Sequence, residues 1–166
     1  MCKIAFVAIV FLLMTAQSAF GHDWESSFRE PCQEFKIPIE LAMAIAKHES
    51  GFNPWAINIA GKGFLPTSKA EAQVLIKQAQ QRKQSFDVGL MQINNWWLER
   101  LHISPEIALL PQNNIRLGLW ILAQEIQRYG FSWQAVGAYH SPHKKRQQVY
   151  AYAVSQHYQR FIAEEK

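Results

Sequence analysis

The stretch from Ile39 to Pro54 constrains the fold of this chain more than any other. Apolar side chains recur in it at helical spacing and predict a helix packed inside a core: Leu41, Ala42, Ile45 and Ala46. Gly51 favours the left-handed conformation that ends helices, and Pro54 forbids continuation. The chain is therefore predicted to be organised around a buried helix that ends near residue 51.

Glu49 lies three residues after Ala46 and four after Ile45, so it continues the apolar stripe. Apolar neighbours and the negative end of the helix dipole both disfavour the charged carboxylate and raise its pKa. A glutamic acid with a raised pKa suits a general acid near neutral pH. The alternative is a structural glutamate at a frayed helix end that is exposed to solvent.

The N-terminus has the pattern of a secretory signal peptide. Lys3 precedes an apolar segment, residues 4–14, which is too short to span a bilayer comfortably. Two small-residue cleavage patterns follow, at residues 16–18 and 19–21, and we favour the second. Residues 1–21 are then a signal peptide and His22 is the mature N-terminus. The alternative is an uncleaved membrane anchor, and both interpretations predict export.

Residues 22–166 have the length and composition of one domain with a sizeable core. Hydrophobic residues make up 49% of the chain and charged residues 18%, which argues against disorder. The formal charge of +4 favours an acidic partner, and nucleic acid, anionic lipid and anionic cell-wall glycan all fit it. The densest basic cluster, Lys144–Arg146, is interpreted as a solvated face.

Cys32 is the one cysteine left after the signal peptide is removed, so no internal disulfide and no cysteine-based metal site is expected. It is either buried and inert or paired with another molecule. His48-Glu49 looks like the start of a zinc-binding HExxH motif, but Phe52 stands where the second histidine is needed. His140 and His143 lie close together without a third ligand. The sequence predicts no metal site.

Strand signals are few, and the sequence predicts an all-α fold with a loop at residues 51–66. Beside the Glu49 helix, we expect helices over residues 23–35 (short or kinked at Pro31), from 67 or 68 to about 81, from 113 or 114 to 129, from 132 to before 142, and 145–162. Ser68 and Glu71 have the spacing of a capping box.

The second stretch with chemical character is Ser85–Trp97. The amides Gln92 and Asn94 lie among apolar residues and are followed by Trp96 and Trp97. Sugar rings stack on aromatic faces, and their hydroxyl and acetamido groups need fixed donors and acceptors. This stretch therefore predicts a sugar-binding groove, although one of the two tryptophans is expected in the core.

Asp87 in the same stretch has two interpretations. It is a second catalytic carboxylate, as an inverting hydrolase requires. Alternatively it anchors the loop through its own backbone, which we favour because it lies close before a glycine.

Four segments, in this order, resemble motifs of the family 1 lytic transglycosylases. ESGFNP, from Glu49 to Pro54, resembles their ES-x-F-NP motif, and GLMQIN, from Gly89 to Asn94, resembles GLMQI. Ala138-Tyr139 resembles the start of AYN, and Tyr150-Ala151 with Val154 resembles the tyrosine segment near the domain end. The resemblance covers roughly residues 30–160. It implies a lysozyme-like fold of the goose type, a single compact helical domain around a buried catalytic helix.

The resemblance also implies a reaction. Such enzymes cleave the β-1,4 bond between N-acetylmuramic acid and N-acetylglucosamine in peptidoglycan and leave 1,6-anhydromuramoyl ends. Glu49 would be the sole catalytic acid and base. Substrate-binding or orienting roles would fall to Ser50, Gln92, Asn94, Tyr139 and Tyr150. No cofactor is implied.

The Asp87-Val88 prefix and the helix near residues 68–81 look most like small exported transglycosylases that accompany conjugation, type IV and type III secretion machines. The implied location is the periplasm, without stable membrane insertion after signal cleavage. The implied partners are peptidoglycan glycan strands and subunits of such a machine, not nucleic acid. The enzyme would open the wall locally for that machine.

The chain departs from the family pattern at His140, where asparagine is usual, and at Cys32, which lacks the second cysteine that these relatives often carry. Two other functions are kept open. One is a goose-type lysozyme-like hydrolase of the same bond, with Asp87 or another acid activating water. The other is a non-catalytic wall-binding or assembly subunit.

Overall fold

The computed structural model describes residues 23–164, which begin with two packed helices. The predicted signal peptide lies outside these residues. Helix α1, Trp24–Phe35, is capped by the Asp23 side chain, and it runs through Pro31 without the predicted break. Helix α2, Ile39–Ser50, ends as predicted at Gly51, whose φ of 60° is left-handed.

Four short strands form an antiparallel sheet in the order β2-β1-β3-β4. They are β1 (Ile57–Ile59), β2 (Lys62–Phe64), β3 (Phe86–Val88) and β4 (Ile93–Asn94). Residues 51–66 were predicted as loop, so β1 and β2 were missed. Strands of two or three residues are too short for an alternating pattern to stand out.

The predicted all-α class is confirmed as a helical fold, because eight helices carry most of residues 23–164. The sheet is an addition that was not predicted, since β3 and β4 were missed as well. After α2 the helices are α3 (Lys69–Gln81), α4 (Asn95–Arg100), α5 (Pro105–Ala108), α6 (Pro111–Tyr129), α7 (Trp133–His140) and α8 (Lys144–Glu164). Helices α4 and α5 were not predicted, and α6 begins two residues before the earliest predicted start. The predicted cap of α3 is present, since the Ser68 side chain accepts from the backbone N–H of Glu71.

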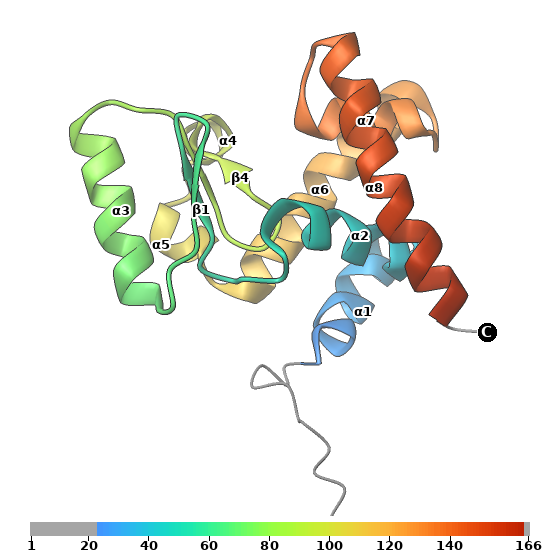
Figure 1. Ribbon diagram of the computed structural model, residues 1–166, viewed down its shortest axis with the longest axis horizontal. Helices are drawn as coiled ribbons and strands as arrows, with labels where there is room; N and C mark the ends of the chain where they lie inside the picture. The colour runs from blue at the N-terminus through green and yellow to red at the C-terminus, as the bar shows by residue number, and fades with distance from the viewer. Residues whose placement is uncertain (1–22, 165–166) are drawn as a thin grey trace, which may run out of the picture.

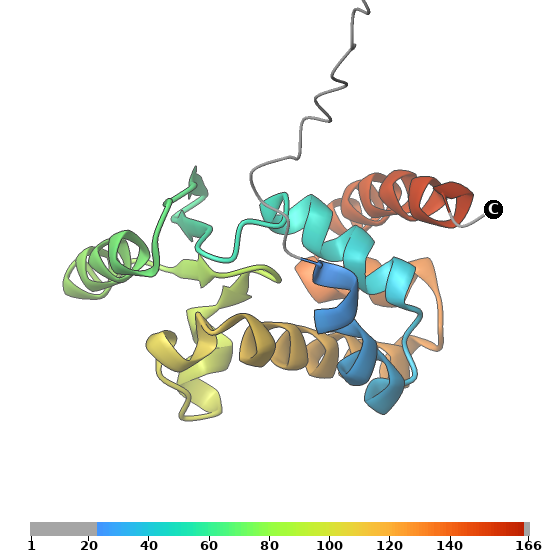
Figure 2. The same cartoon turned by 90° about the horizontal axis from the view of Figure 1, so that it is seen from below.

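The helices and the sheet form two sides, and helix α6 lies between them (Figures 1 and 2). Figures 1 and 2 show the sheet and α3 on one side of the molecule and α7 with α8 on the other. Helix α6 runs between them (Figure 2), and α8 packs against both α2 and α7.

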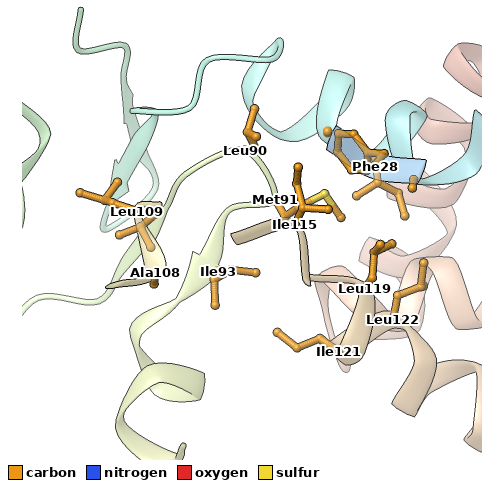
Figure 3. Close-up of a cluster of buried hydrophobic side chains, with 14 of the residues drawn as sticks. Phe28, Leu90, Met91, Ile93, Ala108, Leu109, Ile115, Leu119, Ile121 and Leu122 are labelled. Atoms are coloured by element: carbon orange, nitrogen blue, oxygen red, sulfur yellow. The ribbon is translucent and has the colours of Figure 1, made fainter. Parts of the chain in front are cut away.

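The core joins α1, α2, α6 and the segment that leads into β4. Phe28 of α1 packs with Met91 and with apolar side chains of α6, as Figure 3 shows. In α2 the predicted stripe is buried, since Leu41, Ala42, Ile45 and Ala46 are at most 4% exposed, and Ala44 is buried beside it. Each large aliphatic side chain buried in this way contributes about 1.5–3 kcal/mol. Helix α2, which carries Glu49 in its last turn, is therefore held on most of its circumference.

Asn114 is a buried polar residue in this core, and it fixes the segment between β3 and β4. Its Oδ1 accepts from the backbone N–H of Met91 at 2.7 Å. Its Nδ2 donates to the carbonyls of Val88 (2.9 Å) and Ala108 (2.8 Å). Gly89 passes so close that a Cβ there would lie 2.3 Å from Nδ2 of Asn114, and its φ is +79°. Only glycine fits this approach.

We expect Asn114→Ala to destabilise the protein by about 3–5 kcal/mol, because it leaves one buried N–H and two buried carbonyls without partners. Asn113→Ala is the matched control, since Asn113 is exposed and makes a single side-chain hydrogen bond, to the carbonyl of Ile107. Urea unfolding measures both. Equal midpoints for the two variants would contradict the role given to Asn114.

Candidate active site

Glu49 lies in the last turn of α2, half-buried, at the end of the buried stripe. Its Oε1 accepts a hydrogen bond from the Tyr150 hydroxyl at 2.6 Å. Burial raises the pKa of Glu49 to about 8; the hydrogen bond from Tyr150 opposes this rise and the charge of Asp87 adds to it. At pH 7 the carboxyl is therefore mostly protonated and is not freely exposed to solvent.

Tyr150 is buried in α8 and is held by two imidazole rings. The His140 ring stacks on it with centroids 4.6 Å apart and planes 2° apart. The His48 ring meets it edge-on at 5.0 Å. Burial lowers the pKa of His48 and of His140 below 6.5, so both rings are mainly neutral at pH 7. His140, which stands where the family usually has asparagine, thus supports the partner of Glu49.

A groove of about 730 Å³ opens in front of Glu49. The sheet side contributes Asn58, Asp87, Gln92 and Asn94, and α6 contributes Ile121 and Glu125. The α7–α8 side contributes Tyr139, His140, Arg146 and Gln147. This volume has room for sugar rings, and the polar lining offers fixed donors and acceptors.

Gln92 and Tyr139 hold the segment that forms one wall of the groove. Gln92 has a left-handed φ of 47°, which is unusual for a residue with a side chain. Its Nε2 donates to the carbonyls of Ala56 (3.0 Å) and Gly89 (2.9 Å). The Tyr139 hydroxyl donates to the carbonyl of Met91 at 2.6 Å. Both residues line the groove, and their hydrogen bonds fix its shape.

Asp87 lines the same groove as Glu49 and is half-buried. Its Oδ1 accepts from Nδ2 of Asn94 at 2.7 Å, so the anchor is a neighbouring side chain and not the backbone of Asp87 itself. Burial raises the pKa of Asp87, and the hydrogen bond from Asn94 opposes the rise. Asn94 also caps α4 through its Oδ1, which accepts from the backbone N–H of Trp96 at 2.9 Å.

Ser50 is not brought into the groove. Its hydroxyl donates to the carbonyl of Ala46 one turn earlier at 3.0 Å, and the residue is only 7% exposed. The structure thus places Ser50 behind Glu49, where its side chain is satisfied within α2.

The two tryptophans divide as the sequence suggested. Trp96 is 51% exposed, and the Arg100 guanidinium lies 4.6 Å from the centre of its ring. Trp97 is half-buried and packs edge-on against Trp120 at 5.7 Å. Both line the groove, and Trp96 offers an exposed aromatic surface for a sugar ring.

Glu125 was missed by the sequence analysis. It lines the groove from α6, and its Oε2 is buried without a hydrogen-bond partner, with Arg128 3.6 Å away. A charged residue on an amphipathic helix gives no sign of which groove it faces, so only the fold could reveal it.

Across residues 23–164, no group of three histidine, cysteine, aspartate or glutamate side chains is placed to hold a metal ion. In the same part of the chain, none of the helices has the length and apolar character needed to cross a membrane. Cys32 is buried, and burial raises the pKa of its thiol to about 12, so the thiol is inert near neutral pH.

A mainly helical domain with a protonated glutamic acid in a groove of amides and aromatic rings belongs to the lysozyme-like class of glycan-cleaving proteins. Residues 26–162 match the sequence model of the Transglycosylase SLT domain, so the chain belongs to this family. The match covers nearly all of the described residues, from α1 to the last turns of α8.

Curated proteins give the same result. The chain is 32% identical to Protein IpgF of Shigella sonnei over 142 residues, which is 81% of this chain and 80% of that protein. It is 33% identical to Invasion protein IagB of Salmonella typhi over 140 residues, 82% of this chain and 72% of that protein. It is 32% identical over 95 residues to Type IV secretion system protein virB1 of Brucella abortus, which covers 56% of this chain and 40% of that protein.

These findings confirm the predicted family, fold and enzyme class: the protein is a lytic transglycosylase whose substrate is peptidoglycan. The geometry of the groove, and not the family match, bears on which residues perform the reaction.

We expect Tyr150→Phe to lower kcat/KM about 10–100-fold and to move the basic limb of its pH profile to higher pH. The hydrogen bond from Tyr150 lowers the pKa of Glu49, so its removal raises that pKa further. Tyr158→Phe on the same helix is the matched control, because Tyr158 packs on Trp133 away from Glu49. An unmoved limb in Tyr150→Phe would contradict this assignment.

Proposed function

We propose that Glu49 is the single catalytic acid and base of this lytic transglycosylase. The observation that carries the proposal is the environment of its carboxyl group. This group lines a groove, accepts from Tyr150, and has a pKa raised to about 8, chiefly by burial. A general acid works best when its pKa lies near the operating pH.

In the first step, Glu49 donates its proton to the glycosidic oxygen as the bond from that oxygen to C1 of the muramic acid breaks. The leaving sugar departs with a neutral hydroxyl, and positive charge develops at C1. Asp87 lines the same groove, and a negative charge there would stabilise this positive charge.

In the second step, Glu49 is a carboxylate and accepts the proton of the C6 hydroxyl of the same sugar while its oxygen bonds to C1. The product is the 1,6-anhydro ring, and Glu49 regains its proton. Attack from within the same sugar needs no second acid to activate water, because the nucleophile is already held next to C1.

The remaining predicted residues have supporting roles in this proposal. Gln92 and Tyr139 shape the groove wall, Asn94 holds Asp87, and Tyr150 orients the Glu49 carboxyl. Ser50 supports the end of α2 from behind instead of binding substrate.

Asp87 supports a second candidate, a hydrolase of the same bond. Its carboxyl shares the groove with Glu49, which is the arrangement that water activation needs. The hydrogen bond from Asn94 to Oδ1 of Asp87 reduces the strength of this carboxylate as a base, so transglycosylation is the favoured reaction.

We also propose that residues 1–21 direct export and that the enzyme works in the periplasm, where it opens the wall for a secretion or conjugation apparatus. Support comes from the sequence pattern of those residues. Further support comes from similarity to a protein named as a type IV secretion system component and to one named as an invasion protein.

We expect Glu49→Gln to abolish wall digestion, with a loss of about 10²–10⁴-fold, while raising the melting temperature at pH 7 by about 5 °C. The folded state binds the Glu49 proton more tightly than the unfolded chain does. The carboxyl group therefore costs stability that grows as pH rises from 4.5 to about 8, on the order of 2 kcal/mol at pH 7. Glutamine carries no such cost.

Glu106→Gln is the matched control for both measurements, because Glu106 is exposed on α5 and lies outside the groove. Full wall digestion by Glu49→Gln would show that Glu49 is not the catalytic residue. An unchanged melting temperature would show that the carboxyl group is not buried as described.

Mass spectrometry of digested peptidoglycan distinguishes the two reactions, because anhydro ends are lighter than hydrolysed ends by one water. We expect anhydro ends from the wild type and from Asp87→Asn. In that variant kcat/KM falls about tenfold and its basic limb moves to lower pH, because the charge that raises the pKa of Glu49 is gone. If the wild type gave hydrolysed ends and Asp87→Asn did not, the enzyme would be a hydrolase instead.

A further inference from the structure

A second cavity, of about 760 Å³, lies beside the catalytic groove and is lined mainly by basic side chains. Three are imidazoles and two are cations: His48, His140, His143, Lys145 and Arg146. Tyr150, Val149 and Ala153 of α8 complete the lining, so no carboxylate is among these residues. We call this cavity the basic pocket.

The charges of the basic pocket have no counter-ion within residues 23–164, since neither Lys145 nor Arg146 forms an ion pair there. Both lie in the first turn of α8, where positive charge is opposed by the helix dipole. Arg146 also acts on His140, and His140 acts on His48, each lowering the pKa of the imidazole it faces. An anion bound here would compensate the positive charges of Lys145 and Arg146.

The basic pocket adjoins the site of catalysis. His140 and Arg146 line both the basic pocket and the catalytic groove. The Tyr150 ring lines the pocket, while its hydroxyl reaches Glu49 at 2.6 Å. A ligand in the pocket is therefore separated from the catalytic carboxyl by little more than one aromatic ring.

Within the proposed function, the sugar at Glu49 is muramic acid, whose lactyl group carries a peptide with free carboxylates. An extended peptide advances about 3.3–3.6 Å per residue. Because the groove and the basic pocket share His140 and Arg146, a peptide that leaves the groove on this side enters the pocket. In the groove, Asp87 repels a carboxylate when it is charged, and Arg128 already faces Glu125 at 3.6 Å. The basic pocket has no carboxylate in its lining and is therefore the more favourable place for an anion.

We propose that the basic pocket binds the carboxylates of this stem peptide and so selects muramic acid residues that still carry it. Lysine and arginine form charge-assisted hydrogen bonds with carboxylates, and a neutral imidazole adds one donor. The inference rests on the proposed function and adds a specificity that Glu49 alone does not supply.

The test compares intact peptidoglycan with glycan strands from which an amidase has removed the peptides. The variant is His143→Gln with Lys145→Gln; both residues are exposed, and neither lines the catalytic groove. On intact peptidoglycan we expect kcat/KM to fall roughly tenfold, mostly through KM, as the loss of one or two charge-assisted hydrogen bonds implies. On peptide-free strands we expect a value within about twofold of the wild type.

Lys77→Gln is the matched control, because Lys77 is an exposed residue of α3 that lies outside both cavities, and the change removes one positive charge. An equal loss on both substrates, no loss on either, or the same loss in Lys77→Gln would overturn the inference while leaving the proposed function intact. Wild-type enzyme that cuts neither substrate would overturn the proposed function, and the inference would fall with it.

Discussion

The proposed activity depends on keeping one carboxyl group protonated at the end of a buried helix. Apolar residues of α2 hold that end in the core, and Gly51 stops the helix directly after Ser50. Burial favours the neutral form of Glu49, but burial alone would not orient it. The hydrogen bond from the Tyr150 hydroxyl orients the Glu49 carboxyl. The pKa of this phenol is raised well above 10, so it remains a donor at any pH where the enzyme works. The two His rings around Tyr150 then fix the donor itself.

The opposite wall of the groove depends on a different kind of interaction. The segment between β3 and β4 lacks regular structure of its own and includes left-handed backbone at Gly89 and Gln92. Such a segment keeps one shape only when its surroundings determine it. Asn114 of α6 makes three hydrogen bonds that hold this part of the chain, and the Tyr139 hydroxyl of α7 makes one, to the carbonyl of Met91. Asn114, a polar residue in the core, thus shapes the substrate site. Met91 joins the two sides of the molecule, because its backbone bonds to both Asn114 and Tyr139.

The sequence was informative where a pattern has one physical meaning. The stripe of α2, its stop at Gly51 and the cap at Ser68 were all predicted because periodicity and capping are local. The strands at residues 57–64 were missed, since three residues carry no period, and Pro31 lies inside α1 although proline usually breaks a helix. The partner of Glu49 is a residue 101 positions away, so its hydrogen bond follows from tertiary packing. Motif resemblance named Tyr150, but only the structure showed that Ser50 turns back into its helix and that Glu125 faces the groove.

In the proposed mechanism a single acid is sufficient, for a physical reason. A hydrolase must hold a water molecule against C1 and remove its proton, which calls for a basic carboxylate on the far side of the bond. In this groove the other carboxyl candidate, Asp87, already accepts a hydrogen bond from Asn94, which lowers its basicity. The C6 hydroxyl needs no such help, because a nucleophile within the same sugar gains an effective concentration that reaches roughly 10⁵ M or more in well-oriented systems. Asp87 can then act through its charge alone, by raising the pKa of Glu49 before the bond breaks and by stabilising positive charge at C1 afterwards.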